Sequence, residues 1–185
     1  MAHYNGAVSL PVNTYDAFRN AVLGNSYDFD GISGCQCVDL PKELNYNLGY
    51  SSPYWDTGGT GKAYGGWTVT SARNFNAGTQ YDLIYNKYEI KRGDMIVMNW
   101  TPQNEFGHVT FADEDYNGTN QLACLGQNQG GGTPAPGGGT TAVVTNLGLS
   151  DFLGAFRLKA WNVQPITYRK HKFPWVLYAR KLRKQ

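Results

Sequence analysis

"YDFDGISGCQCVDLPKELN", residues 27–45, places three aspartates and two of the chain's three cysteines in one short segment. Pro41 has no N–H group and its ring clashes with the preceding turn, so a proline fits a helix only within its first turn. We therefore expect a loop over residues 23–34 and a helix that begins near Cys37. The exposed amides of a helix start carry partial positive charge, which favours a thiolate over a thiol. Because a thiolate is a good nucleophile for acyl transfer, Cys37 is a candidate catalytic residue.

The order of the remaining elements indicates the fold class. Thr14 can cap a helix that runs to about Leu23, and the glycine- and tyrosine-rich residues 49–78 favour loops and short helical turns. The tract GGGTPAPGGG, residues 130–139, is expected to be a long hairpin loop, because too little chain follows it for a second domain. Helices that precede an antiparallel sheet predict an α+β domain. The runs with strand-like composition are 94–100, 107–113, 121–128, 154–160 and 175–182.

Composition limits the possible classes of protein. The chain has 185 residues and 41% hydrophobic content, which is enough for one globular domain with a core. The formal charge is +2 and the pI is about 8.4, with basic residues concentrated in the C-terminal tail, so no sequence-specific nucleic-acid binding is expected. No apolar run reaches the roughly 18 residues of a membrane span, so we expect no stable membrane insertion. The odd number of cysteines predicts at least one free thiol.

A cysteine nucleophile needs a base, and the chain has three histidines. His3 lies near the N-terminus and His171 in the basic tail, where solvated side chains are expected. His108 follows Gly107 at the start of a predicted strand, so a substrate could approach it closely. A single histidine on a strand is more often a hydrogen-bonded core residue, and a cysteine outside disulfides is more often a small buried apolar one. Local context alone leaves both interpretations open.

Five segments occur in the order and spacing of a known family: GCQCVDL at 34–40, KRGDMIVM at 91–98, GHVTF at 107–111, LGQNQ at 125–129 and LGAFR at 153–157. By these segments, the chain resembles CHAP domains, the cysteine- and histidine-dependent amidohydrolase/peptidase modules, over roughly residues 10–160, and it looks like a bacteriophage endolysin. The resemblance implies a papain-like fold, in which a helix that carries the nucleophile packs against an antiparallel sheet. It also implies hydrolysis of an amide or peptide bond of bacterial peptidoglycan.

The resemblance assigns roles to individual residues. Cys37 follows a glutamine and stands two residues before an aspartate, as the family's nucleophile does, whereas Cys35 takes a variable position. His108 is the implied base, and Asn128 is the residue implied to orient its imidazole. Gln36 is implied to help stabilise the oxyanion.

One position departs from the family pattern. Many relatives have a carboxylate two residues before the asparagine, where this chain has Gly126. The imidazolium then lacks the support of a nearby negative charge, so either Asn128 suffices or another acid substitutes. Asp113 and Glu114, on the predicted strand of His108, are the candidate substitutes, although such residues more often face solvent.

The three aspartates of the opening segment have no role in this assignment. Their pattern does not fit an EF-hand, because Ile32 and Ser33 stand at its fifth and sixth positions. Calcium-binding CHAP domains have an acidic loop directly before the nucleophile, so the resemblance implies a structural calcium ion; a solvated turn at Asp30 and Gly31 is the alternative. The cysteine spacing does not suit tetrahedral zinc. The implied calcium ligands are the carboxylates of Asp28, Asp30 and Asp39 and the carbonyls of Ile32 and Gly34.

We therefore expect a CHAP catalytic domain over residues 1–160 and a basic, aromatic extension over 161–185 that belongs to the same domain. The expected protein is a monomeric endolysin-type cysteine hydrolase whose partner is peptidoglycan; the choice between an amidase and an endopeptidase stays open. The N-terminal residues lack a secretory signal, so we expect synthesis in the host cytoplasm, followed by holin-type release or delivery on a virion. The alternative is a catalytically inactive wall-binding or virion structural protein on the same scaffold.

Overall fold

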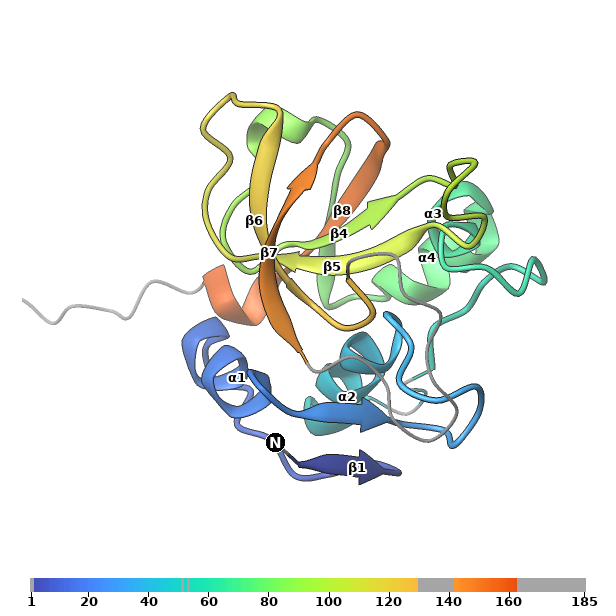
Figure 1. Ribbon diagram of the computed structural model, residues 1–185, viewed down its shortest axis with the longest axis vertical. Helices are drawn as coiled ribbons and strands as arrows, with labels where there is room; N and C mark the ends of the chain where they lie inside the picture. The colour runs from blue at the N-terminus through green and yellow to red at the C-terminus, as the bar shows by residue number, and fades with distance from the viewer. Residues whose placement is uncertain (1, 51, 53, 130–141, 163–185) are drawn as a thin grey trace, which may run out of the picture.

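A six-stranded antiparallel sheet forms the larger part of the molecule (Figure 1). The computed structural model describes residues 2–50, 52, 54–129 and 142–162. Strands that are consecutive in the chain lie side by side in the centre of the sheet, whose order is β3-β8-β4-β5-β6-β7, and β8 returns to pair with both β3 and β4. The strands are β3 (Tyr81–Ile84), β4 (Met95–Met98), β5 (His108–Ala112), β6 (Gln121–Gly126), β7 (Val143–Gly148) and β8 (Phe152–Leu158).

Helices and a small parallel sheet complete the described structure. Figure 1 shows α1 and α2 together on one side of the large sheet, and α3 and α4 at one end of it. The two short strands β1 (His3–Asn5) and β2 (Ser26–Asp28) pair with each other in parallel. The helices are α1 (Tyr15–Val22), α2 (Asp39–Asn47), α3 (Gly65–Thr68) and α4 (Thr70–Ala77), with single 3-10 turns η1 (Lys87–Glu89) and η2 (Lys159–Asn162).

The first helix follows the predicted capping and spacing. The Thr14 hydroxyl accepts a hydrogen bond from the N–H of Ala17 at 3.1 Å, which satisfies one of the free amides of the first turn. Phe18 and Val22 lie one turn apart on the same face and are fully buried. The ring of Phe18 packs edge-on against Phe111 of β5, with 5.4 Å between ring centroids. The predicted helix after Thr14 is therefore confirmed, and it packs on the sheet.

The central strand β4 is buried on both faces. Met95 and Val97 belong to the apolar cluster that contains α1 and α2 residues, whereas Ile96 and Met98 belong to a second cluster on the other face. All four residues are buried, which explains why this strand is a continuous apolar run rather than an alternating one. The second cluster also contains Ile84, Ile90, Ala112, Leu122, Cys124, Leu149 and Ala155.

The predicted α+β class is confirmed, and four predicted strands between residues 94 and 160 correspond to β4, β5, β6 and β8. The strands β1 and β2 were not predicted, and β2 lies inside the segment 23–34 that was expected to be a loop. The strands β3 and β7 were not predicted either. Both are edge strands with a single neighbour in the large sheet, and β7 is mostly half-buried, so neither shows the full alternation of a packed strand. The helix α4 was also not predicted, because residues 49–78 were assigned to loops and short turns.

The C-terminal extension, 161–185, is described only at its first two residues. The indole N–H of Trp161 donates to the carbonyl of Val12 at 2.9 Å, and its ring packs edge-on against Tyr15 at 5.5 Å between centroids. The start of the extension is thus part of the core on the helix side. The rest of the extension, including the predicted strand 175–182, lies outside the described residues, as does the predicted hairpin loop 130–139. The boundary at residue 160 stays a prediction.

A glycine-to-alanine substitution in β8 tests the packing of the sheet. A Cβ atom at Gly154 would overlap the Trp67 ring, whereas a Cβ atom at Gly148 in β7 would meet nothing closer than a carbonyl at 3.9 Å. We expect Gly154→Ala to lower the free energy of unfolding by about 1–3 kcal/mol, and Gly148→Ala to change it by less than about 0.5 kcal/mol. Urea denaturation followed by tryptophan fluorescence measures both, and equal effects of the two variants would contradict this packing.

Candidate active site

Cys37 and the start of β5, the strand that His108 begins, meet at the junction between α2 and the sheet. Cys37 lies in the turn directly before α2, whose first residue is Asp39 and whose N-cap is Val38. The backbone N–H of Val109, the residue after His108 in β5, donates a hydrogen bond to the Cys37 sulfur. The structure therefore brings the predicted nucleophile next to the predicted base, although they are far apart in the chain.

Gly107 allows the chain to place His108 at this junction. Its φ of 69° lies in the left-handed region, which glycine adopts without strain. A Cβ atom there would come within 2.7 Å of the Met98 carbonyl oxygen and 2.9 Å of the Tyr64 Cβ atom. Glycine is thus required both by the backbone conformation and by the close approach of two neighbouring segments. It lets the half-buried His108 begin β5 at the strand end whose next residue, Val109, contacts Cys37.

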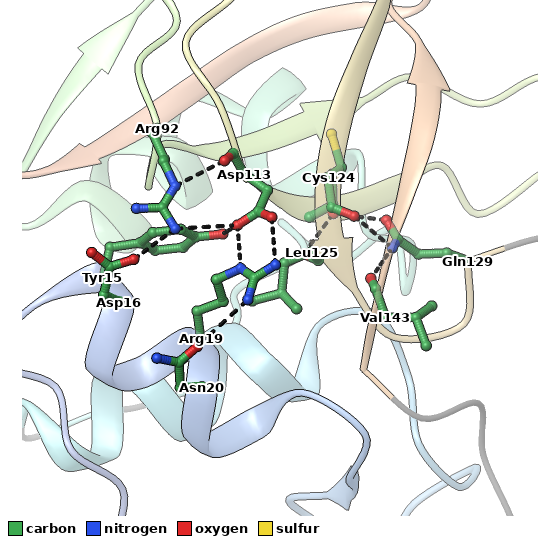
Figure 2. Close-up of polar contacts among 11 residues, drawn as sticks. Tyr15, Asp16, Arg19, Asn20, Arg92, Asp113, Cys124, Leu125, Gln129 and Val143 are labelled. Carbon is green, nitrogen blue, oxygen red and sulfur yellow. Dashed lines mark hydrogen bonds and ion pairs between the residues drawn. The ribbon is translucent and has the colours of Figure 1, made fainter.

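The side chain of Gln129, rather than that of Asn128, reaches the imidazole. His108 Nε2 lies 3.5 Å from Gln129 Oε1. Figure 2 shows the other end of this amide, whose Nε2 donates to the carbonyls of Cys124 at 3.0 Å and Val143 at 2.7 Å. Because the NH₂ group is used by two carbonyls, Oε1 is the atom left to face the imidazole. Gln129 was not predicted from the sequence. The only signal for it there was that a second amide side chain directly follows Asn128.

Gly126 is the position that leaves room for the Gln129 amide. A Cβ atom at Gly126 would come within 2.8 Å of Gln129 Oε1 and of the Thr110 hydroxyl oxygen. Thr110 itself donates a hydrogen bond that the structure places on the Leu125 carbonyl or on Gln129 Oε1, each at 2.8 Å. A side chain at position 126 and the amide of Gln129 therefore compete for the same space. The amide of Gln129, three residues further on, thus occupies the space that a side chain at position 126 would need.

Asn128 and Gln36 are placed differently from their expected roles. Asn128 has a φ of 53°, a conformation that asparagine tolerates, and none of the side-chain hydrogen bonds identified within the described segments involves it. The Gln36 side chain donates to the carbonyl of Ser33 at 2.7 Å, which uses one of its two amide protons. Its backbone N–H donates to a carboxylate oxygen of Asp39 at 2.6 Å. Both assignments stay predictions, and Gln36 has one amide proton available for an oxyanion.

Burial keeps the thiol and the imidazole neutral. It raises the pKa of Cys37 to about 11, an effect that the hydrogen bond from Val109 opposes, and Asp39 raises the pKa further. Burial also lowers the pKa of His108 to about 4, whereas the hydrogen bond to Gln129 acts in the opposite direction. The helix start alone favours a thiolate, but the loss of hydration at the sulfur outweighs it. A neutral imidazole beside a thiol is the protonation state in which His108 can act as a general base.

The two acids considered as substitutes at position 126 have other partners. Figure 2 shows Asp113 between α1 and the sheet, where it accepts hydrogen bonds from Arg19 Nε at 2.6 Å and from the Tyr15 hydroxyl at 3.0 Å. Arg92 approaches the same carboxylate at 3.6 Å. Glu114 accepts a hydrogen bond from the N–H of Ala123 at 3.0 Å. Asp113 therefore ties α1 to the sheet, and neither acid is a partner of His108.

The acidic loop does not present an open calcium site in this arrangement. Asp30 and Asp39 both bind the ammonium group of Lys42, at 2.7 Å and 3.1 Å. Asp28 is buried, and its Oδ1 atom has no hydrogen-bond partner. Across the described ranges, no group of three or more His, Cys, Asp or Glu side chains is arranged to hold a metal ion. The residues as placed do not fit a calcium ion, and the calcium ligands, including the Ile32 and Gly34 carbonyls, stay a prediction.

Comparisons with known proteins give one similar fold and one similar sequence. No protein-family model matches the chain. The fold is similar to that in the crystal structure of the wild-type endolysin LysIME-EF1, with a TM-score of 0.60 over 80% of this chain and 64% of that one; at 21% sequence identity, the likeness concerns the fold. The chain is also 34% identical over 127 residues to the D-alanyl-L-alanine endopeptidase of Streptococcus phage B30. In fold and in sequence, the chain is thus similar to phage endolysins.

The sequence match to the phage B30 protein covers only part of that protein. The aligned region covers 66% of this chain but only 26% of the phage B30 protein, so the chain spans about a quarter of that relative's length.

No helix in the described part of the chain is long and apolar enough to cross a bilayer.

The reactivity of Cys37 toward iodoacetamide tests the electrostatics of the site. Because the raised pKa leaves little thiolate at neutral pH, we expect slow alkylation at pH 7 and a rate that increases about tenfold per pH unit to roughly pH 10. Mass spectrometry of the digested protein locates the modified cysteine. Cys124 serves as the internal control, because it is fully buried and burial raises its pKa to about 12. A rate at Cys37 that is already constant below pH 7 would show a thiolate–imidazolium pair instead.

Proposed function

We propose that this chain is a cysteine peptidoglycan hydrolase of the phage endolysin type, built on a CHAP-like scaffold. The observation that supports the proposal is the hydrogen bond from the Val109 N–H to the Cys37 sulfur, which joins the thiol to the residue that directly follows His108. The pairing of a cysteine with a histidine that has its own hydrogen-bond partner is the arrangement that nucleophilic catalysis requires. The similarity to phage endolysins supports peptidoglycan as the substrate.

In the proposed mechanism, His108 takes the thiol proton as the Cys37 sulfur attacks the carbonyl carbon of the scissile bond. The carbonyl oxygen becomes an oxyanion, for which backbone N–H groups and the free amide proton of Gln36 are the proposed donors; one such donor contributes about 3 kcal/mol to transition-state stabilisation. The imidazolium then returns its proton to the leaving amine, and an acyl-enzyme remains. Water, deprotonated by His108, hydrolyses this thioester and regenerates the thiol.

The geometry favours Gln129 over Asn128 as the residue that orients the imidazole. Gln129 Oε1 can accept a hydrogen bond from the Nε2–H group of His108, which leaves Nδ1 as the nitrogen that receives the thiol proton. The amide is held by two carbonyls and a hydroxyl, so its orientation does not depend on the substrate. An amide supports the imidazolium less than a carboxylate does, which agrees with a resting pair that is neutral.

The bond that we propose is a peptide bond rather than the N-acetylmuramoyl–L-alanine amide. The relative from phage B30 is named for cleavage between D-alanine and L-alanine, and the matched region includes most of this chain. Mass spectrometry of fragments released from purified walls decides between the two. New termini at alanine in a cross-bridge mark an endopeptidase, whereas stem peptides released intact from the glycan mark an amidase.

The remaining expectations follow from the same proposal. We propose a monomer that acts on the wall from the host cytoplasm after holin-type release, or as part of a virion. The second candidate function is a wall-binding or virion structural protein without activity. It predicts that the parent protein pellets with purified walls and releases no fragments from them.

Substitution of Cys37 tests the nucleophile. We expect Cys37→Ala to lower the rate of wall hydrolysis by at least about a thousandfold, because no other described group beside His108 can form the thioester. Clearing of a suspension of purified walls measures the rate. Cys35→Ala is the matched control, a fully buried cysteine two residues away that should keep activity within about threefold. Equal rates for Cys37→Ala and the parent would rule out this nucleophile.

A pair of amide variants decides which residue orients His108. Gln129→Met removes the hydrogen bond that raises the pKa of His108, so we expect kcat to fall roughly tenfold or more and the acid limb of the pH profile to move to lower pH. Asn128→Gly removes the neighbouring amide and suits the local positive φ, so it should keep kcat within about threefold. The proposed role fails if Asn128→Gly loses activity and Gln129→Met keeps it.

A further inference from the structure

Lys42 is a nearly buried cation at the centre of the acidic loop. Its side chain is 9% exposed, and its ammonium group lies 2.7 Å from Asp30 Oδ2 and 3.1 Å from Asp39 Oδ1. Asp39 is fully buried and Asp30 is partly exposed. The two carboxylates come from different parts of the chain, since Asp30 lies in the loop and Asp39 begins α2. The ammonium group therefore joins the loop to the helix.

Each of these carboxylates uses its second oxygen to hold the backbone of the loop. Asp30 Oδ1 accepts a hydrogen bond from the N–H of Ile32 at 3.0 Å, and Asp39 Oδ2 accepts one from the N–H of Gln36 at 2.6 Å. Lys42 is thus the centre of a set of contacts that runs from Asp30 to Gln36 and back to α2. Cys37 stands between Gln36 and Asp39, inside this closed segment.

A calcium ion would need the oxygens that Lys42 already binds. Calcium takes six to eight oxygen ligands at about 2.3–2.6 Å, and at least two of the expected ones here contact an ammonium group. A positive charge at this place also repels a divalent cation. The third acid, Asp28, stands two residues before Asp30 and is buried. It makes no contact with Lys42 that the structure identifies. Two of the three carboxylates are therefore neutralised by the protein itself.

We propose that Lys42 is the resident cation of this loop and takes the place of a metal ion, so that the segment carrying Cys37 is positioned without calcium. Its ammonium group supplies the charge that keeps Asp30 and Asp39 together, and its position in the first turn of α2 makes the cation a permanent part of the helix. Lys42 is a positioning residue, and its effect on catalysis rests on the proposed role of Cys37. The absence of a calcium requirement does not rest on that role.

Two lysine variants test this proposal with a readout that needs no activity. Lys42→Met removes the ammonium group but keeps most of the side-chain length. Lys91→Met is the matched control, because Lys91 also binds a carboxylate, that of Asp115 at 2.9 Å, but both side chains are 58% exposed. Thermal unfolding and isothermal titration with calcium chloride are measured for the parent and both variants, in excess EGTA and in excess calcium, with magnesium chloride as the comparison ion.

We expect the parent to have the same Tm with EGTA and with calcium, and to bind no calcium in the titration. Lys42→Met should lower Tm by roughly 6 °C or more in EGTA, because Asp30 and Asp39 then repel each other, and calcium should restore part of the loss better than magnesium does. Lys91→Met should change Tm by less than about 2 °C and should not respond to calcium. The rate of wall hydrolysis should fall about tenfold or more in Lys42→Met and recover in part with calcium.

Three results would each overturn the proposal. Calcium binding by the parent, with a higher Tm, would mean that the metal displaces Lys42 or sits beside it on Asp28. A Lys42→Met variant that behaves like Lys91→Met would mean that the ammonium group does not hold the loop. A loss of Tm that calcium does not reverse would mean that Lys42 does not take the place of a metal; if Lys42→Met fails to fold, Lys42→Gln gives the same comparison. A parent that is stable without calcium but hydrolyses no walls would refute the proposed function alone.

Discussion

The hydrogen bond between the Val109 N–H and the Cys37 sulfur is the contact on which the site depends. It joins the turn before α2 to the first residues of β5, so the register of one strand determines where the thiol lies relative to the imidazole. Two features hold the partners of this bond in place. The apolar faces of α1 and α2 pack on the helix side of the sheet, and Asp113 ties α1 to the end of β5 through Arg19 and Tyr15.

Local chemistry in the sequence was enough to predict much of the framework of the fold, whereas the roles of Cys37 and His108 came from the resemblance and stay predictions. The Thr14 cap, the position of Pro41 and the apolar central strands depend on neighbours in the chain, and these elements are where they were expected. The edge strands β3 and β7 were missed because they have one partner and little of the alternation that burial imposes. What could not be predicted depends on contacts between distant segments.

The protonation state of Cys37 and His108 is one property that depends on contacts between distant segments. A helix start favours a thiolate, and this local effect was the one visible in the sequence. The structure adds the removal of water by the packed sheet and helices, which raises the pKa of Cys37 and lowers that of His108. The contacts of Lys42 also combine a local and a distant part. Its three-residue spacing from Asp39 is visible in the sequence, but its approach to Asp30 requires the folded loop.

The exclusion between position 126 and Gln129 constrains how this site could evolve. A chain with Gly126 that acquires an acid there meets the Gln129 amide before the acid can serve the imidazole, because a Cβ atom alone already lies within 2.8 Å of it. A side chain at position 126 would therefore have to be matched by a change at position 129, since the two compete for the same space beside Thr110.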